Sequence, residues 1–524
     1  MTGTDAGTVR DLLLARAADH RTGLSFEDRT WTWHEVVAES ARWAATLGSQ
    51  LPAEGPRHVG VLLDNLPEFC FLLGAAALED IVVVGLNPTR RGSALAEDVA
   101  RTDVALVLTE PRHAGLLPED LPVPVWDVTG TSWSALLARH DTDIPSAAAA
   151  PDDLLMLIFT SGTSGAPKAV RVTHEKVAGP GRLLAERFGL GPDDVAYLSM
   201  PLFHSNAVMA GWAPALASGT GIALARRFSA SGFLEDVRRH GATYANYVGK
   251  PLTYVMATPQ RADDADNPLR VVFGNEANER DIAGFGDRFG CTVVDSYSST
   301  ENAVIVQRRP DMPAGSLGMP LEGVDVLDPA TAERTADAVF DDDGRLANPE
   351  AAIGELVNTH GAGAFAGYYN DPAAEAERMR GGRYWSGDLA YRDRDGWVYF
   401  AGRSGDWLRV DGENLATAPI ERILLRHPAI AEAAVYAVPD PDVGDQVVAA
   451  MTTAGALTPE EFESFLGAQD DLAIKAWPRH VRLLEALPRT ATNKVLKREL
   501  AAAGTGHDGT RWERAERGTS YAVR

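Results

Sequence analysis

The chain has 524 residues, 45% of them hydrophobic, with a formal net charge of −24 and an isoelectric point near 4.9. This length exceeds the size at which one hydrophobic core stops growing, so we expect at least two domains. The acidic excess argues against a nucleic-acid partner, because no basic surface is available to replace the counterions of a phosphate backbone.

The cysteines and the apolar segments indicate the cellular compartment that we expect for the protein. Cys70 and Cys291 are the only cysteines and cannot make a disulfide framework, so we expect a reducing, cytoplasmic environment. The first residues have neither the basic nor the apolar region of a signal peptide. The most apolar stretch, residues 69–86, is interrupted by Glu79 and Asp80 and is shorter than the ~20 residues that span a bilayer. We therefore expect no membrane span, and a homodimer is left open.

Short apolar runs alternate with amphipathic segments in the first part of the chain. They predict strands at residues 58–63, 81–86, 104–108, 154–160, 196–198 and 271–273, and helices at 33–47 and 94–101. Strands that alternate with helices predict an α/β fold of mostly parallel sheets covered on both faces.

The texture changes in the second part. Residues 311–348 are rich in Gly, Pro and Asp, which predicts a smaller β-rich section. A helix at 420–426, a strand at 430–438 and a helix at 459–466 predict a compact C-terminal α+β domain. We therefore expect domains at residues 1–404 and 405–524, with a charged, frayed end at 501–524.

Residues 160–168 read TSGTSGAPK and follow the apolar run 154–159 directly. Gly162 and Gly165 allow successive backbone N–H groups to converge on an anion, and the hydroxyl side chains add donors. Lys168 supplies a positive charge, and it is one of only six lysines in the chain. The spacing differs from that of a Walker loop. A phosphate-binding loop is favoured over a flexible linker.

Four further segments carry chemically useful residues. The segment DSYSSTEN (295–302) offers Tyr297 for stacking on a purine, Thr300 for a phosphate and Glu301 for Mg²⁺. In residues 384–406, Asp388 lies in a predicted Ser-Gly-Asp turn suited to ribose hydroxyls, and DRDGWVYF is typical of a hairpin. The others are WLRVDGENLATAPIE (407–421) and PRTATNKVLKREL (488–500), which contains Lys494.

In this order, the five segments resemble the adenylate-forming superfamily of acyl-CoA synthetases, adenylation domains and luciferases. PLFHSNA (201–207), NYVGKP (246–251), FGNEAN (273–278) and DGEN (411–414) are most similar to the fatty-acid-transport and very-long-chain acyl-CoA synthetase branch, and to its actinobacterial FadD-type members. The resemblance implies a large N-terminal AMP-binding domain, a small mobile C-terminal domain, and the use of ATP, Mg²⁺ and CoA.

The resemblance also assigns roles. Lys494 would bridge the acid and the α-phosphate, Thr300 would contact that phosphate, Glu301 would hold Mg²⁺, His204 would act as a gate beside the acid, and Asp406 would be the hinge. The residues that would bind ATP are Thr160, Ser161, Gly162, Thr163, Ser164, Gly165, Lys168, Gly274, Asn275, Glu276, Ala277, Tyr297, Ser299, Asp388 and Arg403. The acid pocket would contain Phe203, Asn206, Trp212, Tyr247, Val248, Gly249 and Lys250, and the CoA path Gly412, Glu413 and Asn414.

The expected reaction is activation of a fatty or aryl acid as acyl-AMP with release of pyrophosphate, followed by thioester formation with CoA. Three departures from the common motifs, Ser298 in place of glycine, Ala418 and Pro419, motivate an alternative. On the same scaffold the chain would activate nitrite for diazotisation of an aryl amine, or pass an acyl group to a carrier protein. A nucleotide-binding regulatory protein is a third hypothesis, and the retention of Lys168, Glu301, Asp388 and Lys494 argues against it.

Overall fold

The computed structural model describes residues 7–160, 167–277, 279–309, 311–341, 346–403, 407–410, 413–440, 444–469, 472, 474–489, 495–506, 508–515 and 518–524. By compactness the chain divides into unit 1, Met1–Asn302 with Ala364–Ala376, and unit 2, Ala303–Gly363 with Glu377–Arg524. The chain therefore passes between the units three times. The domain boundary expected at 404/405 from the sequence stays a prediction.

The described part of unit 1 contains two sheets whose neighbouring strands are parallel, except in the pairs β1–β2 and β7–β8. The first runs β13 (Thr292–Asp295), β12 (Val271–Asn275), β11 (Tyr244–Val248), β9 (Val195–Leu198), β10 (Gly221–Leu224), β1 (Thr22–Phe26) and β2 (Arg29–Thr32). The second runs β6 (Val125–Asp127), β5 (Val104–Thr109), β3 (His58–Leu62), β4 (Val82–Gly85), β7 (Leu154–Thr160) and β8 (Lys168–Thr173). The six strands predicted from apolar runs are confirmed.

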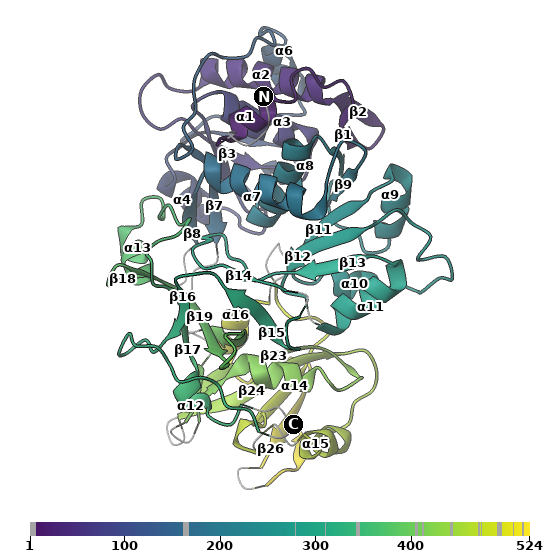
Figure 1. The fold of residues 1–524 in the computed structure, drawn as a ribbon, viewed down its shortest axis with the longest axis vertical. Helices are drawn as coiled ribbons and strands as arrows, with labels where there is room; N and C mark the ends of the chain where they lie inside the picture. The colour runs from purple at the N-terminus through teal and green to yellow at the C-terminus, as the bar shows by residue number, and fades with distance from the viewer. Residues whose placement is uncertain are drawn as a thin grey trace. The chain divides into compact units, whose positions relative to one another are not determined.

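Helices cover these sheets and fill the space between them (Figure 1). They are α1 (Val9–Leu14), α2 (Trp33–Gln50), α3 (Pro67–Leu78), α4 (Ser93–Arg101), α5 (Pro111–Ala114), α6 (Thr131–Leu137), α7 (His174–Phe188), the π-helix η1 (Ala207–Trp212), α8 (Ala213–Ser218), α9 (Phe233–His240), α10 (Pro251–Met256) and α11 (Glu279–Phe289). Thr32 caps α2 and exchanges hydrogen bonds with Glu35, the reciprocal pattern that fixes a helix start. Helix α7 contacts η1, which in turn contacts β9 and β11.

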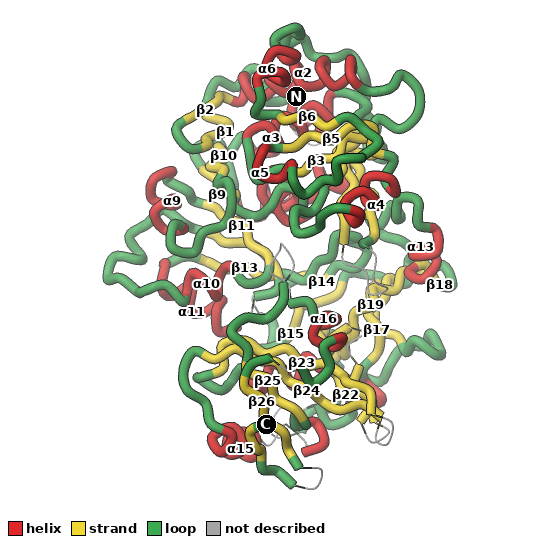
Figure 2. Tube along the Cα trace, turned by 180° about the vertical axis from the view of Figure 1, so that it is seen from behind, coloured by secondary structure: helices red, strands yellow, loops and turns green. Residues whose placement is uncertain are grey.

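Unit 2 consists mainly of strands, as Figure 2 shows from behind. One sheet runs β14 (Val306–Gln307), β15 (Ser316–Pro320), β20 (Val398–Arg403), β19 (Arg383–Arg392), β17 (Gly354–Asn358) and β16 (Val324–Leu327), with β18 (Met379–Arg380) on β19. The other runs β22 (Glu413–Ala416), β21 (Trp407–Val410), β24 (Gly444–Thr453), β25 (His480–Leu483), β26 (Thr510–Arg514) and β27 (Tyr521–Val523), with β23 (Ile430–Asp440) on β24. Helical segments are α12 (Pro349–Ala352), α13 (Pro372–Arg378, which crosses the unit boundary), α14 (Thr417–Leu424), α15 (Pro459–Gly467), the 3₁₀ helix η2 (Ile474–Ala476) and α16 (Lys497–Ala502).

The expectation that residues 501–524 fray is wrong. Strands β26 and β27 extend the second sheet of unit 2, and β26 pairs with β25. Trp512 and Tyr521 lie in the core and pack edge-on or tilted against Phe462 of α15. The burial of two aromatic rings outweighs the local charge, because each removes a large apolar area from water.

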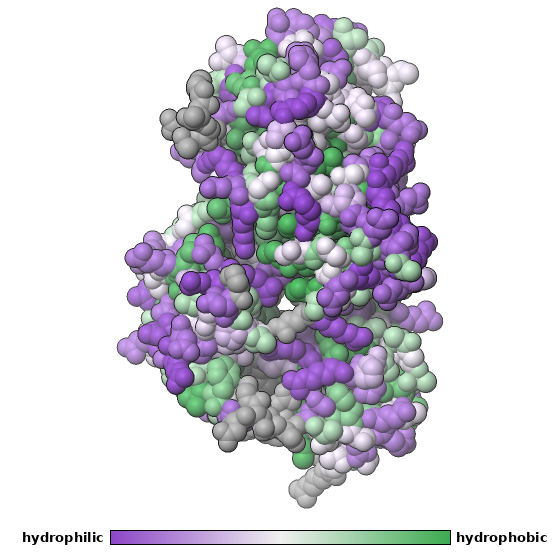
Figure 3. Space-filling view, turned by 45° about the vertical axis from the view of Figure 1, so that its right-hand side comes forward, coloured by the Kyte–Doolittle hydropathy of each residue, from purple (hydrophilic) through white to green (hydrophobic). Residues whose placement is uncertain are grey.

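Hydrophilic and apolar side chains are interspersed over the face of the molecule in Figure 3, as expected when 23% of the residues are charged. Among the described residues, no helix has both the length and the apolar character needed to cross a bilayer.

Candidate active site

Two of the predicted segments, PLFHSNA and DSYSSTEN, meet inside unit 1. The Ser205 and Thr300 hydroxyl oxygens lie 3.0 Å apart and share a hydrogen bond, although 95 residues separate them in the chain. Both side chains are buried. Gly85 at the end of β4 lets the PLFHSNA segment pack closely on that strand, because a Cβ there would lie 2.8 Å from the Phe203 carbonyl oxygen. The segment expected to meet the acid therefore contacts the residue expected to meet the α-phosphate.

His204 stands in the chain between Phe203, which packs on β4, and Ser205, which bonds Thr300, and it is half-buried. Its backbone N–H donates to the Pro201 carbonyl at 3.0 Å, and its Nδ1 accepts a long hydrogen bond of 3.4 Å from the Asn206 N–H. This Nδ1 contact favours the tautomer that carries its proton on Nε2. The predicted gate role is not contradicted by this placement and stays a prediction.

The loop after β12, expected to border adenine, is held by one carboxylate. Asp295 at the end of β13 accepts hydrogen bonds from the Tyr247 hydroxyl at 2.7 Å and from the Ala277 N–H at 3.0 Å. Glu276, the residue before Ala277, adopts a left-handed backbone, φ +68°, which needs such support in a residue other than glycine. A Cβ at Gly274 would lie 2.1 Å from the Tyr247 carbonyl oxygen, so only glycine fits there.

Glu301, expected to hold Mg²⁺, is oriented by Tyr368. The Tyr368 hydroxyl donates to a Glu301 carboxylate oxygen at 2.9 Å. Tyr368 belongs to the segment that returns to unit 1, and its backbone bridges Val170 of β8. The buried Lys168 ammonium lies 5.4 Å from the centre of the same ring, within range of a cation–π contact. A fixed carboxylate is a hard oxygen ligand, so Glu301 fits the Mg²⁺ that the resemblance implies.

Lys176, on the first turn of α7, carries a buried charge that the sequence did not bring to attention. Its side chain is 4% exposed, and among the described residues its Nζ has no hydrogen-bond partner. Burial lowers the pKa of Lys176 to about 8, and the negative charge of Glu301 opposes that shift. A charge buried without a hydrogen-bonded partner is costly, so Lys176 destabilises the fold at neutral pH.

We expect Lys176→Met to raise the free energy of unfolding by about 1–4 kcal/mol at neutral pH, because an apolar chain replaces a desolvated ammonium. The pKa of Lys176 is lower in the folded than in the unfolded protein, so the unfolded state binds more protons between pH 8 and 10.5. The stability that Lys176 removes is therefore regained as the pH rises through that interval. Urea unfolding of both proteins across it should show the gap between them closing.

Arg187→Met is the matched control, since Arg187 is an exposed cation on the same helix. The difference in free energy of unfolding between Arg187→Met and the unmodified protein should not vary between pH 8 and 10.5. A stability gap for Lys176→Met that stays constant with pH would contradict the burial of an unpaired ammonium.

Strand β11, which carries the predicted pocket residues Tyr247 and Val248, presents side chains on both of its faces. Tyr244 donates through its hydroxyl to the Ala210 carbonyl of η1 at 2.6 Å, and Asn246 faces the same side. Tyr247 points the other way, as alternation in a strand requires, and packs in the core with Val272 and Phe285. On the Asn206 side Tyr247 therefore offers only its carbonyl, which accepts from Asn206 Nδ2 at 2.9 Å.

The remaining predicted pocket residues lie near the ends of elements. Trp212 ends η1 and is 1% exposed, and Val248 ends β11 and is buried. Gly249 has φ +73°, and its N–H donates to the Asn275 carbonyl at 2.9 Å. Lys250 is the residue before the first turn of α10. Their contact with an acid stays a prediction.

In unit 2, the Ser-Gly-Asp sequence forms a bulge and not the expected turn. Asp388 lies within β19, and the irregularity is at Gly387, which has φ +75°. The Gly387 N–H donates to the buried Glu355 carboxylate at 2.7 Å, and Asp388 pairs across the ladder with Arg403 of β20. The backbones of Asp388 and Arg403 are therefore adjacent, and the contact of both residues with the nucleotide stays a prediction. The hairpin predicted from DRDGWVYF is also confirmed.

Several predicted residues belong to segments outside the described residues. Thr160 ends β7 and pairs with Lys168, whereas Ser161, Gly162, Thr163, Ser164 and Gly165 lie outside the described residues. The same holds for Asp406, Gly412 and Lys494, and for the side chains of Arg403, Glu413 and Asn414. Tyr297 is half-buried and Ser299 exposed beside Thr300.

Two supporting residues escaped the sequence reasoning. Asp295 ends a parallel strand, a place where functional side chains gather, and this signal could have singled it out. Tyr368 offered no such signal, because its approach to Glu301 depends on the bridge between its backbone and β8.

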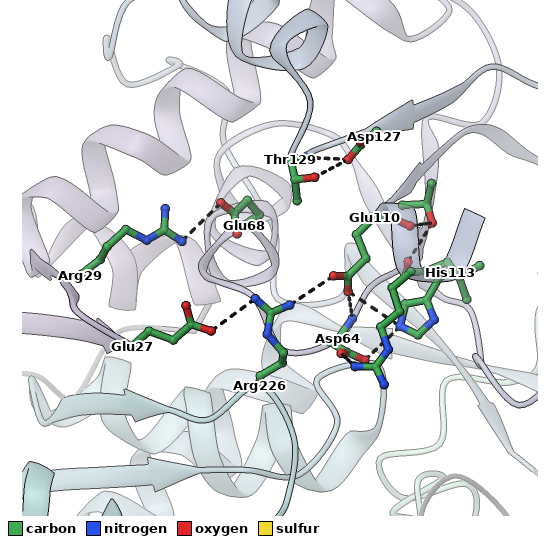
Figure 4. Close-up of polar contacts among 12 residues, drawn as sticks. Glu27, Arg29, Asp64, Glu68, Glu110, His113, Asp127, Thr129 and Arg226 are labelled. Atoms are coloured by element: carbon green, nitrogen blue, oxygen red, sulfur yellow. Dashed lines mark hydrogen bonds and ion pairs between the residues drawn. The ribbon is translucent and has the colours of Figure 1, made fainter. Parts of the chain in front are cut away.

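A cluster of metal-ligand types also occurs in unit 1, away from these motifs in the sequence. Asp64, Glu110 and His113 offer ligand atoms within 4.8 Å of one another. Figure 4 shows that this group is already bonded internally and to arginine: His113 Nε2 lies 2.9 Å from Asp64, and Glu110 pairs with Arg226 at 3.2 Å. Arg112 also pairs with Asp64 at 2.7 Å. The cluster is a balanced ion-pair network and carries no indication of a metal.

Comparisons with known proteins agree with the motifs. The chain matches the AMP-binding enzyme family over residues 14–369 and the AMP-binding enzyme C-terminal domain over residues 419–494. It is 54% identical to a medium/long-chain-fatty-acid–CoA ligase of Mycobacterium marinum, over 95% of this chain and 96% of the relative. It is 48% identical to the steroid-22-oyl-CoA synthetase of Rhodococcus jostii, over 94% and 90%.

A similar solved structure is o-succinylbenzoate CoA synthetase of Bacillus subtilis, at 26% identity. Its complex with ATP and magnesium superposes with a TM-score of 0.77 over 93% of this chain and 98% of that one. Its complex with the acyl-adenylate intermediate gives 0.78 over 95% and 99%. The chain therefore belongs to the adenylate-forming family of AMP-binding enzymes, as one of its acid:CoA ligases.

Proposed function

We propose that this acid:CoA ligase acts on a large, predominantly apolar carboxylic acid, either a medium- to long-chain fatty acid or the side-chain acid of a steroid. The general reaction is activation of an acid by ATP, with Mg²⁺, as acyl-AMP, followed by thioester formation with CoA. The two relatives that share about half of their residues with this chain over nearly their full length take such acids, to judge by their names. Aryl acids, also considered from the sequence, have no comparable support.

The contact between Ser205 and Thr300 is the observation that carries the site assignment. It places the PLFHSNA segment directly against the residue expected to bind the α-phosphate. An acid carboxylate beside His204 would then approach the α-phosphate at one buried point. Holding two reactants in this way contributes strongly to rate, because it replaces a bimolecular encounter.

The chain's own residues would meet the charge that develops in adenylation. Carboxylate and α-phosphate repel each other, and the oxygens of the transition state gather further negative charge. Mg²⁺, when bound, would offset part of it, and Glu301, fixed by Tyr368, is suited to hold the ion. Thr300 would donate to a phosphate oxygen, and Lys168 would add a buried positive charge near the phosphates.

We assign the remaining steps to residues of unit 2. Asp388, with Arg403 opposite it in the ladder, would bind the ribose hydroxyls. Lys494 would bridge carboxylate and α-phosphate in the first step, and a rotation at Asp406 would then bring Gly412, Glu413 and Asn414 to the CoA path. Such an exchange of Lys494 for residues 412–414 suits a two-step enzyme, because its active site must exclude water in the first step and admit the thiol of CoA in the second.

A pyrophosphate-release screen tests the substrate class. Fatty acids of medium and long chain, a steroid side-chain acid, aryl acids and nitrite are compared at equal concentration, each with CoA present and absent. We expect release with the fatty or steroid acids only, and CoA thioester as the product in mass spectrometry. Release with nitrite plus an aryl amine, or product only with a carrier protein as acceptor, would replace this proposal by one of the alternatives.

The cytoplasmic location and the homodimer considered from the sequence stay predictions. Size-exclusion chromatography with light scattering measures the second directly.

A further inference from the structure

Three asparagines and one serine form a continuous row of hydrogen bonds in unit 1, which we call the amide row. Asn246 Nδ2 donates to Asn206 Oδ1 at 2.7 Å, and Asn206 Nδ2 donates to Asn275 Oδ1 at 3.1 Å. Asn275 Nδ2 then donates to Ser298 Oγ at 2.6 Å. The row begins at a buried position on β11 and ends at an exposed one beside Tyr297. It joins the wall expected to meet the acid with the segment expected to border adenine.

The direction of the amide row is fixed by a backbone group. A side-chain amide can be turned around, so its orientation needs a partner that plays only one role. The Tyr247 carbonyl can only accept, and it receives Asn206 Nδ2 at 2.9 Å. The same NH₂ group faces Asn275, which must therefore present its oxygen to Asn206 and its NH₂ to Ser298.

This direction leaves each end of the row with a defined requirement. The Ser298 oxygen accepts from Asn275, so its own proton is left to donate to an acceptor outside the row. At the buried end, Asn246 Oδ1 has no hydrogen-bond partner among the described residues. Each hydrogen bond within the row is therefore donated in the direction of the exposed serine, and Asn206 Nδ2 donates in addition to the Tyr247 carbonyl.

We propose that Ser298 binds the nucleotide, donating a hydrogen bond from its hydroxyl to an acceptor atom of the adenosine part of ATP, and that the amide row, through Asn275, positions this hydroxyl. The proposal rests on the proposed function, through the assignment of Gly274–Ala277 and Tyr297 to the adenine site. Where the common motif has glycine, this chain would then have a serine that hydrogen-bonds the nucleotide, with its hydroxyl oriented by Asn275.

Binding and kinetics of Ser298 variants test the proposal. Ser298→Ala should weaken ATP binding, measured by calorimetry without acid, and raise the KM for ATP about threefold to tenfold, the value of one neutral hydrogen bond. The kcat and the KM for the acid should stay unchanged, and Ser298→Thr should restore ATP binding. Ser229→Ala, which removes another exposed serine of unit 1 that accepts one N–H, is the matched control and should bind ATP normally.

Asn275→Asp tests the orientation, because it replaces the NH₂ that faces Ser298 with an oxygen that attracts the serine proton. It should weaken ATP binding more when Ser298 is present than in the Ser298→Ala background. Additive effects within about twofold would overturn the role of the row, and unchanged ATP binding in Ser298→Ala would overturn the role of Ser298. Since calorimetry needs no acid, these outcomes are distinct from a failure of the acid screen.

Discussion

Lys494→Ala should lower acid-dependent pyrophosphate release by about a hundredfold to a thousandfold. The reason is that a preorganised charge which stabilises transition-state oxygens in a water-poor site is typically worth ~3–4 kcal/mol. The measurement is release with a saturating acid under the conditions of the screen. Thioester formation from supplied acyl adenylate and CoA should be spared, since Lys494 is assigned only to the first step.

Lys497→Ala is the matched control on the same segment. Lys497 Nζ bonds the Thr417 hydroxyl at 2.9 Å and Glu421 at 2.8 Å, so its loss affects the packing of α16 and α14 and not the proposed chemistry. It should retain adenylation. Normal adenylation by Lys494→Ala, or equal loss in both half-reactions, would remove Lys494 from its assigned role.

Glu301→Gln should reduce adenylation by about a hundredfold or more and raise the magnesium concentration needed for half-maximal rate. The substitution keeps the shape and the contact with the Tyr368 hydroxyl but removes the negative charge that a divalent cation requires. Titration of the rate with Mg²⁺ at saturating ATP separates this effect from a general loss of folding.

Tyr368→Phe tests the support of that carboxylate. It removes one hydrogen bond to Glu301 and keeps the ring under Lys168. We expect a loss of no more than about tenfold, with the same direction of change in magnesium dependence. A magnesium requirement that is unaltered in Glu301→Gln would show that another residue holds the ion.

Much of the fold could be predicted because local pattern and tertiary burial agree. The runs at β3, β4 and β7 are mostly apolar and mostly buried, as expected for strands of a sheet covered on both faces, and each prediction agrees with the structure within a residue or two. Prediction failed where one local signal permits two outcomes. Glycine with positive φ occurs both in turns and in bulges, so the sequence predicts a turn at Gly387. In the structure Glu355 accepts the Gly387 N–H and keeps this residue within a strand.

Of the candidate site, too, only a part could be predicted from the sequence. The motifs made His204, Thr300 and Glu301 candidates, because the proposed chemistry resides in those side chains, whereas Ser205 was not singled out. The supporting residue Tyr368 could not be found, since it reaches Glu301 through a backbone bridge to β8 that no local pattern encodes. Trp512 and Tyr521 were missed for a related reason: two isolated aromatics in a charged tail show no periodicity.

The division of the chain has a practical consequence for protein engineering. The segment Ala364–Ala376, which carries Tyr368, belongs to unit 1 although it lies between two stretches of unit 2. A chimera that exchanged everything after Asn302 with a related ligase would therefore import a foreign tyrosine loop against the resident Glu301. A chimera designed to change substrate preference should therefore take residues 364–376 from the same parent as residues 1–302.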